Sequence, residues 1–248
     1  MDSSSTPFTL PGKTVLITGA ARRLGFHMAL TVARAGANVI VHHAHSPEAA
    51  EHARGEIQSL GVRAEIVTAD LSDPLQAQEL LDQALQFGPV DALINSAAVF
   101  EPLTLMTTGL NEWQNHLNIN LTAPFLLCQA FAQSNPAPRL GRIVNILDWR
   151  AERPGMDHFP YNISKAGLSA MTRSLAVTLA PFITVNALAF GAILPPSDGG
   201  ASDTILKNVP AKRWATLEEV SQALLFLLNG PAYITGEIIH LDGGRHLI

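Results

Sequence analysis

Apolar and polar positions along the chain follow two alternating spacings. Short runs of aliphatic and β-branched residues are typical of buried strands in a parallel sheet. Such runs occur at residues 14–18, 38–42, 64–68, 92–95, 142–147, 184–188 and 237–241. Apolar residues at helical spacing fill the longer segments between them, at residues 24–35, from 46 onward, 73–86, 111–132, 159–180 and 217–228. The pattern therefore predicts seven strands that alternate with helices.

Residues at the predicted helix ends support these boundaries. Gly36 follows the first helix, where a glycine commonly forms the C-terminal cap. Ser46 and Asp73 each precede a proline, an arrangement typical of an N-cap followed by the first helical residue. Thr216 and Glu219 have the spacing of a capping box at the start of the last helix.

Strands that alternate with helices predict a parallel sheet with right-handed crossovers. The expected fold class is α/β, a single doubly wound Rossmann domain with a seven-stranded parallel sheet flanked by helices. We assign residues 13–248 to this domain and residues 1–12 to a flexible leader. The Pro-, Gly- and Ser-containing stretch at about residues 194–210 predicts a flexible substrate flap. In such folds ligands bind at the carboxyl ends of the strands.

Composition narrows the class of protein. Hydrophobic residues make up 47% of the 248 residues and charged residues 15%, which is enough apolar material for a large core. The net charge is −5 without a basic block, so we do not expect nucleic-acid binding. No apolar run reaches the roughly 18 residues of a membrane span. The single cysteine, Cys128, fits a reducing compartment, and we expect a soluble, cytoplasmic protein.

The first predicted strand leads into the turn TGAARRLG at residues 18–25 and then into a helix. A turn in this position lets backbone N–H groups and the helix dipole meet the pyrophosphate of a dinucleotide. An ordinary tight strand–helix turn is the alternative. No acid follows the second strand to hold the ribose 2′-hydroxyl of NAD, so the sequence favours NADPH. Arg22, Arg23, nearby histidines and Ser46 could donate to the 2′-phosphate.

Two further places carry candidate chemistry. In YNISK, Tyr161 and Lys165 lie four residues apart on one face of a predicted helix. A neighbouring ammonium favours the phenolate, so we expect Lys165 to lower the pKa of Tyr161. Asp148 ends the apolar run of NILDWR. An ionised carboxylate can only accept hydrogen bonds, and Asp148 is either part of the reaction or a residue that ends a strand.

These motifs resemble the short-chain dehydrogenase/reductase family over nearly the whole chain, from about Lys13 to Ile248. The turn is similar to the TGxxxGxG loop, with Arg23 at the middle glycine, as in the TGxxxRxG loop of the pteridine reductase branch. The C-terminal LDGGRHLI and the stretch DWRAERPG at residues 148–155 resemble LDGGRHL and DYxxERG of bacterial dihydromonapterin reductases, which also reduce dihydrofolate.

The resemblance implies roles for the reacting residues. Tyr161 would donate a proton, and Lys165 would bind the nicotinamide ribose and tune Tyr161. Asn120 would support a water relay to the lysine; the alternative is a merely polar helix residue. Most of the family has a serine thirteen residues before the tyrosine, where this chain has Asp148 and pteridine reductases have aspartate. Phe100 would stack a flat pterin against the nicotinamide, with ordinary core packing as the alternative.

The resemblance also implies a set of contact residues. The predicted cofactor-binding residues are Gly19, Arg22, Arg23, Leu24, Gly25, His43, His45, Ser46, Asp70, Leu71, Asn95, Ser96, Ala97, Tyr161, Lys165, Gly191 and Ile193. The predicted substrate-binding residues are Arg23, Phe100, Asp148 and Tyr161. Two positions depart from the family, because His45 replaces an arginine near the 2′-phosphate and Phe190 replaces a proline. We predict no metal site, because neighbouring histidines on a strand end do not converge on one ion.

The sequence therefore favours an NADPH-dependent reductase of pterins such as dihydropterin or dihydromonapterin, and also of dihydrofolate. The alternative is a carbonyl reductase, such as a 3-oxoacyl-thioester reductase, which shares Tyr161 and Lys165. A nucleotide-binding sensor without turnover is a third hypothesis, which the set of Tyr161, Lys165 and Asn120 disfavours. By analogy with the family we expect a homotetramer formed through the helices at 111–132 and 159–180.

Overall fold

The computed structural model describes residues 8–195 and 202–248 and contains one seven-stranded parallel sheet. The strands are β1 (Thr14–Ile17), β2 (Asn38–His43), β3 (Ala64–Thr68), β4 (Ala92–Asn95), β5 (Gly141–Asp148), β6 (Ile183–Phe190) and β7 (Ile238–Leu241). Their order is β3-β2-β1-β4-β5-β6-β7, so the chain winds outward from β1 in both directions. The predicted fold class is confirmed, and each predicted strand is present to within two residues.

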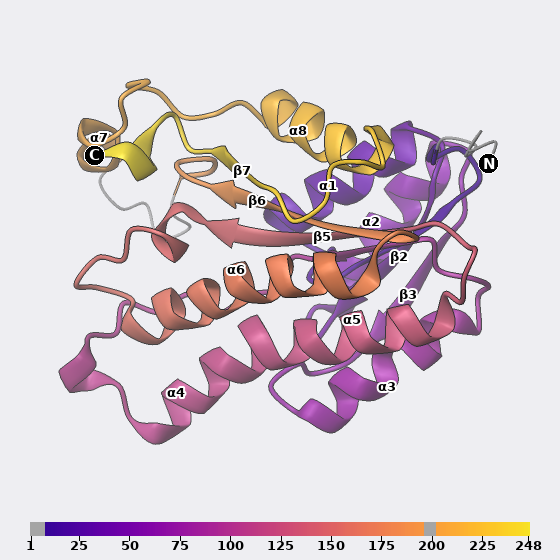
Figure 1. Ribbon diagram of the computed structural model, residues 1–248, viewed down its shortest axis with the longest axis horizontal. Helices are drawn as coiled ribbons and strands as arrows, with labels where there is room; N and C mark the ends of the chain where they lie inside the picture. Colours follow the sequence, from indigo (N-terminus) through magenta and orange to yellow (C-terminus); the bar gives the residue numbers. More distant parts are fainter. Residues whose placement is uncertain (1–7, 196–201) are drawn as a thin grey trace.

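Helices cover both faces of the sheet. They are α1 (Arg23–Arg34), α2 (Pro47–Ser59), α3 (Pro74–Leu85), α4 (Leu110–Leu117), α5 (Ala123–Ser134), α6 (Phe159–Leu179), α7 (Ser202–Lys207) and α8 (Leu217–Asn229). In Figure 1, α1, α2 and α8 lie on one side of the sheet, and α3 to α6 on the other. The arrowheads of β5 and β6, the start of α6, α7 and the C-terminus all lie at one end, on the left of Figure 1.

Alternating side chains of the central strands build the two layers of the core. In β1, Val15 and Ile17 pack on the face that holds Met28 of α1. Leu16 between them points to the opposite face and packs with Leu127 of α5. All of these side chains are buried, as both faces of a doubly wound sheet require. The central strands thereby hold their carboxyl ends in fixed positions.

The single helix predicted at residues 111–132 is interrupted. A π-helical turn, η2 (Asn118–Thr122), separates α4 from α5 and contains the buried Asn120. Pro124 is the second residue of α5 and has no N–H to donate to the carbonyl of Asn120, so the regular series of helical hydrogen bonds is broken there. Sequence spacing could not detect this turn, because the apolar positions on either side remain compatible with a helix. Single π turns occur often at functional sites.

Two predicted flexible segments are only partly within the described residues. In the leader, residues 1–7 lie outside them, but Phe8 and Leu10 are buried, and the Leu10 N–H donates to Asn229 Oδ1 at 3.1 Å. This part of the predicted leader therefore belongs to the folded domain. In the predicted flap, residues 196–201 are not among the described residues. The part that is described includes α7 and the buried Val209. Among the helices that are described, none has both the length and the apolar character to cross a membrane.

Candidate active site

Two adjoining hollows form a cleft at the carboxyl ends of the strands. The larger, of about 610 Å³, lies beside the turn after β1 and the ends of β2 and β3. The smaller, of about 330 Å³, lies over the ends of β5 and β6 and the start of α6. Both are lined by Arg23, Leu24, Ser96, Ala98 and Ile146. A cleft therefore lies at the predicted position of the site, at the edge of the sheet where doubly wound folds bind their ligands.

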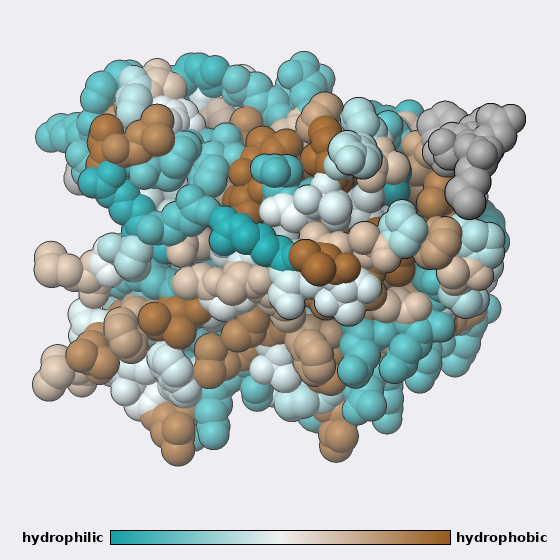
Figure 2. Space-filling view, viewed as in Figure 1, coloured by the Kyte–Doolittle hydropathy of each residue, from teal (hydrophilic) through white to brown (hydrophobic). Residues whose placement is uncertain are grey.

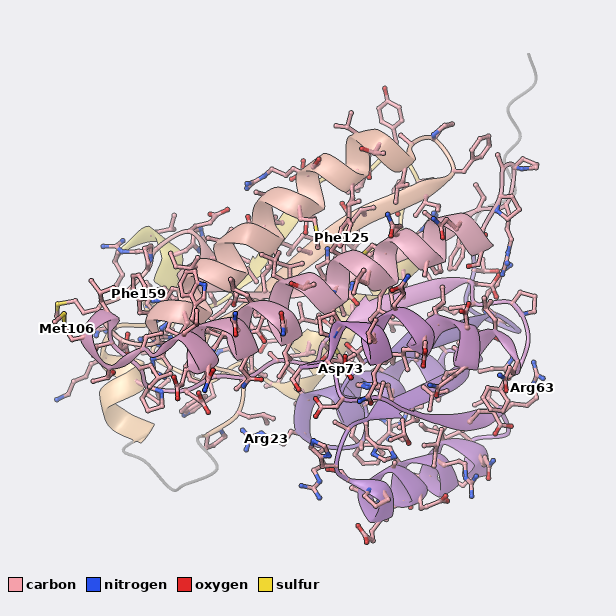
Figure 3. The ribbon with its side chains drawn as sticks, turned by 90° about the horizontal axis from the view of Figure 1, so that it is seen from below. Arg23, Arg63, Asp73, Met106, Phe125 and Phe159 are labelled. Atoms are coloured by element: carbon pink, nitrogen blue, oxygen red, sulfur yellow. The ribbon has the colours of Figure 1, made fainter. Side chains whose placement is uncertain are left out.

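The turn after β1 is held by close backbone packing. Gly25 opens α1 against Gly19, where a Cβ would lie 2.1 Å from the Gly19 carbonyl oxygen. Gly19 has φ +67°, in the left-handed region that favours glycine. Arg23 also lies in that region, with φ 50°, which is strained for a residue with a side chain. Its guanidinium donates to the Pro195 carbonyl at 3.1 Å and spans from the turn toward the chain segment before α7 (Figure 3).

His42 is a site residue that sequence reasoning missed. Its Nδ1 accepts the Gly19 N–H at 3.0 Å, and its Nε2 lies 3.0 Å from the Ala69 carbonyl oxygen. A carbonyl can only accept, so Nε2 carries the proton and the ring is neutral. Burial lowers the His42 pKa from 6.5 to about 4. A neutral imidazole therefore ties the glycine turn to the end of β3.

We expect protonation of His42 to destabilise the protein in mild acid. The folded pKa of about 4 lies below the ordinary 6.5, so the unfolded chain binds more protons between these values and stability falls as pH falls through that window. The full shift corresponds to about 3 kcal/mol. Urea denaturation of wild type and His42→Gln at pH 6.5 and pH 4 measures the loss. Equal losses in both proteins would contradict this role for His42.

The predicted contacts around the larger hollow are only partly brought together. Its lining includes Gly19, Arg22, Arg23, Leu24, Gly25, His45, Asp70, Leu71, Ser96 and Ala97. His45 pairs with Asp70 at 3.2 Å near the surface. His43 and Ser46 do not line it, because the His43 ring is buried and its Nδ1 accepts the Ser46 N–H at 3.3 Å. Asn95 is buried below the cleft and donates to Asn145 at 2.8 Å.

The smaller hollow brings together the predicted reacting residues. Asp148, at the end of β5, and Tyr161 and Lys165, on α6, line it together with Phe100, Gly191 and Ile193. The Tyr161 hydroxyl lies close to the Asp148 carboxylate, whose charge acts on it. The Lys165 ammonium donates to the Ile146 carbonyl at 2.7 Å. Asp148 also accepts the Arg150 N–H at 2.8 Å, so it caps the short helix η3 (Trp149–Ala151) while its side chain faces the cleft.

The lowering predicted for the pKa of Tyr161 is wrong for this arrangement. Burial and the Asp148 carboxylate raise that pKa well above 10, so the phenol keeps its proton at neutral pH. Burial lowers the Lys165 pKa to about 8, and burial raises that of Asp148 against the opposing effect of Arg150. Sequence spacing showed the lysine on the face of Tyr161, but not that burial and the nearby carboxylate would raise the pKa of its hydroxyl.

Asn120 lies beneath the cleft rather than in its lining. Its Oδ1 accepts the Val99 N–H at 2.9 Å, and its Nδ2 lies 3.0 Å from the Val99 carbonyl. The same amide donates to Ser164 on α6 at 3.0 Å. The π turn therefore positions the segment that carries Phe100. The predicted water relay through Asn120 remains a prediction.

Phe100 belongs to a group of aromatic and cationic side chains. The sequence predicted Phe100 and Tyr161 as site residues, but not His158 or Arg150. Its ring is 49% exposed, which argues against the core-packing alternative. It stacks on His158 at 3.8 Å and meets the Tyr161 ring edge-on at 4.7 Å. The Arg150 guanidinium lies 5.6 Å from the Phe100 centroid. Arg150 comes two residues after Asp148, so its position just beyond the strand end could have marked it as a site residue. Nothing in the sequence marked His158 in this way.

Comparisons with known proteins agree with this fold and site. A family model described as Enoyl-(Acyl carrier protein) reductase matches residues 19–246. A 3-oxoacyl-[acyl-carrier-protein] reductase from Synechocystis sp. is 32% identical over 240 residues, which cover 95% of this chain and 97% of that protein. These matches show the class: the chain belongs to the short-chain dehydrogenase/reductase family, and it is an oxidoreductase.

Two solved structures extend the comparison. FolM alternative dihydrofolate reductase 1 from Brucella canis, complexed with NADP, is 33% identical with a TM-score of 0.88, covering 95% of each chain. A blue fluorescent protein from a metagenomic library, in complex with NADPH, is 32% identical with a TM-score of 0.88, covering 96% of this chain and 99% of the other. Sequence identity is similar to an acyl-carrier-protein reductase and to a dihydrofolate reductase, so identity does not distinguish these two substrates.

Proposed function

We propose that the protein is an NADPH-dependent reductase of pterins. The observation that carries the proposal is the Asp148 carboxylate, which lines the cleft together with Tyr161 and lies close to its hydroxyl. In most of this family a hydroxyl donor would hold a ketone oxygen at this position, and a carboxylate cannot donate in its place. A ring that presents N–H groups suits Asp148, because each N–H can donate to it.

NADPH is the cofactor that the larger hollow fits. Its lining combines the N-terminus of α1 with Arg22 and Arg23 and has no acid at the end of β2, a set suited to a dinucleotide with a 2′-phosphate. Two similar structures contain NADP or NADPH. When bound, this cofactor supplies hydride. Lys165, Tyr161 and Gly191 would hold its nicotinamide end, because they line the smaller hollow.

The chain's own residues can supply the proton that a C=N reduction needs. Hydride adds to the carbon of that bond, and one proton must reach the nitrogen for charge to balance. Tyr161 is a protonated phenol at neutral pH and lies at the cleft wall. Asp148 would orient the ring nitrogen and the phenol, while the exposed face of Phe100 offers a stacking surface for a flat heterocycle.

A substrate panel tests the proposal. We expect purified protein to oxidise NADPH when dihydrobiopterin or dihydromonapterin is added, and to use NADH more weakly. NADPH oxidation with acetoacetyl thioesters alone, and with no pterin, would overturn it.

The second candidate is a 3-oxoacyl-thioester reductase. It is favoured by the identity to the Synechocystis enzyme over nearly the full length of both proteins. The two candidates differ in the role of Asp148. Replacement of Asp148 by serine should raise ketone reduction under the pterin proposal, because it restores a hydroxyl donor, and should lower ketone reduction if the wild-type protein is a thioester reductase.

We also propose a cytoplasmic homotetramer. Apolar side chains gather on the face formed by α4, α5 and α6 (Figure 2), where Phe125, Ile163 and Val177 are exposed. Exposed apolar patches of this kind mark contact surfaces. We expect sedimentation to give four chain masses for wild type, and smaller species for Val177→Glu. A monomeric wild type would contradict the proposal.

A further inference from the structure

A third hollow opens next to the active-site cleft, beside the chain end. It has a volume of about 290 Å³ and is lined by Trp149, Arg153, Asn208 and Arg245, among others. These residues come from the loop after β5, the segment after α7 and the short helix η4 (Arg245–Leu247). No Asp or Glu side chain is among the described residues that line it. The polar side chains in its lining are two guanidinium groups, an amide and the Trp149 indole, and Ile248 also lines it.

Neither arginine of this hollow forms an ion pair with a described residue, although Asp148, Asp157 and Asp242 act on Arg245 from a distance. Arg245 packs with its guanidinium 4.3 Å over the Trp149 ring. Its buried Nε has no hydrogen-bond acceptor among the described residues. Arg150 nearby differs, since it pairs with Asp157 at 3.4 Å. A buried donor without an acceptor costs free energy, and a planar guanidinium is suited to bind a carboxylate through two bonds.

A row of contacting side chains runs from the cleft wall to the hollow. Phe100 lies in the cleft wall, and the Arg150 guanidinium is 5.6 Å from its centroid. Arg150 in turn lies 4.8 Å over Trp149, whose ring also contacts Arg245. Burial and the positive charge of Arg150 lower the Arg245 pKa. Asp148, Asp157 and Asp242 oppose this lowering from a distance. The buried Nε of Arg245 still has no acceptor among the described residues, and a carboxylate in the hollow would supply one.

We propose that this hollow is a carboxylate-binding subsite for the tail of the substrate. Arg245 and Arg153 would hold the carboxylate while the flat ring lies against Phe100 and Asp148. The inference rests on the proposed pterin reductase function and narrows it to pterins with an acidic tail, such as dihydrofolate. A pterin with a neutral polyol tail would reach the cleft but would leave the guanidinium groups without a partner.

Kinetics with two substrates test the subsite. We compare kcat/KM for dihydrofolate with kcat/KM for dihydrobiopterin, whose tail is neutral. In Arg245→Gln we expect this ratio to fall at least tenfold, since hydrogen bonds to charged groups are among the stronger ones. Arg245→Lys should recover part of the ratio, because it keeps the charge and loses the planar fork. Arg63→Gln removes one positive charge at the opposite end of the molecule (Figure 3) and should keep the wild-type ratio.

Arg153→Gln provides a second, independent variant. Arg153 is exposed, so its replacement tests the subsite even where Arg245→Gln fails to fold. We expect a several-fold fall in the same ratio. A ratio that stays at the wild-type value in both folded variants, or an equal loss with both substrates, overturns the subsite alone. Absence of turnover with either pterin in the wild-type protein overturns the proposed function as well.

Discussion

Replacement of Asp148 by asparagine should lower kcat/KM for dihydrobiopterin about 1000-fold, within the range that loss of acid–base assistance produces. Asparagine keeps the volume of the side chain and an oxygen that can accept the Arg150 N–H, so the short helix after β5 should keep its cap. What it removes is the negative charge that faces Tyr161 and Lys165. Steady-state NADPH oxidation measures the loss, and NADPH fluorescence titration measures cofactor affinity, which should change little.

Asp157→Asn is the matched control for this variant. Asp157 is also an acid that pairs with Arg150, at 3.4 Å, but it does not line the cleft. The Asp157 side chain is half exposed, and a pair that is open to solvent on one side contributes little free energy. The activity of this variant should therefore stay within about threefold of wild type. If Asp148→Asn kept wild-type pterin turnover, the carboxylate would have no chemical role and the proposed function would lose its main support.

The positions of the strands could be predicted because each is a contiguous apolar run that is buried on both faces. The register between strands could not. His42 and His43 are neighbours in one run, and the sequence offered no reason to prefer His42 as the residue at the cleft. The distinction comes from the parallel pairing of β2 with β1, in which Val41 lies opposite Ile17, so that His42 lies beside Gly19.

The reacting residues were predicted from spacing and from the family resemblance, while their electrostatics were not. Spacing placed Tyr161 and Lys165 on one helical face, and the resemblance implied Asp148 near them. Neither showed that the ammonium donates to the Ile146 carbonyl at 2.7 Å, or that burial and Asp148 raise the pKa of the phenol. A pKa depends on burial and on the nearest charges, and both are properties of the folded chain. Arg245 illustrates the same limit, because only the folded chain shows that its Nε has no acceptor among the described residues.

The turn after β1 leads to the second large effect, which we expect for Gly25→Ala. The added Cβ would lie 2.1 Å from the Gly19 carbonyl oxygen and 3.2 Å from the Ala20 Cα, both backbone atoms that cannot rotate away. The turn and the start of α1 must separate, and the N–H groups that face the larger hollow move with them. We expect NADPH affinity to fall at least 100-fold, because close backbone approach to the pyrophosphate is what this glycine permits, and overpacking to cost about 1–3 kcal/mol of stability.

Gly55→Ala separates the steric effect from the general effect of a new methyl group. Gly55 lies within α2, and a Cβ there would meet nothing within 4 Å. Alanine favours the helix over glycine by about 1 kcal/mol, so this variant should be slightly more stable than wild type and bind NADPH equally well. Thermal unfolding with and without NADPH measures both quantities in each protein. Both substitutions add one methyl group. If Gly25→Ala bound NADPH as tightly as wild type, the turn after β1 would not be the site that binds the cofactor.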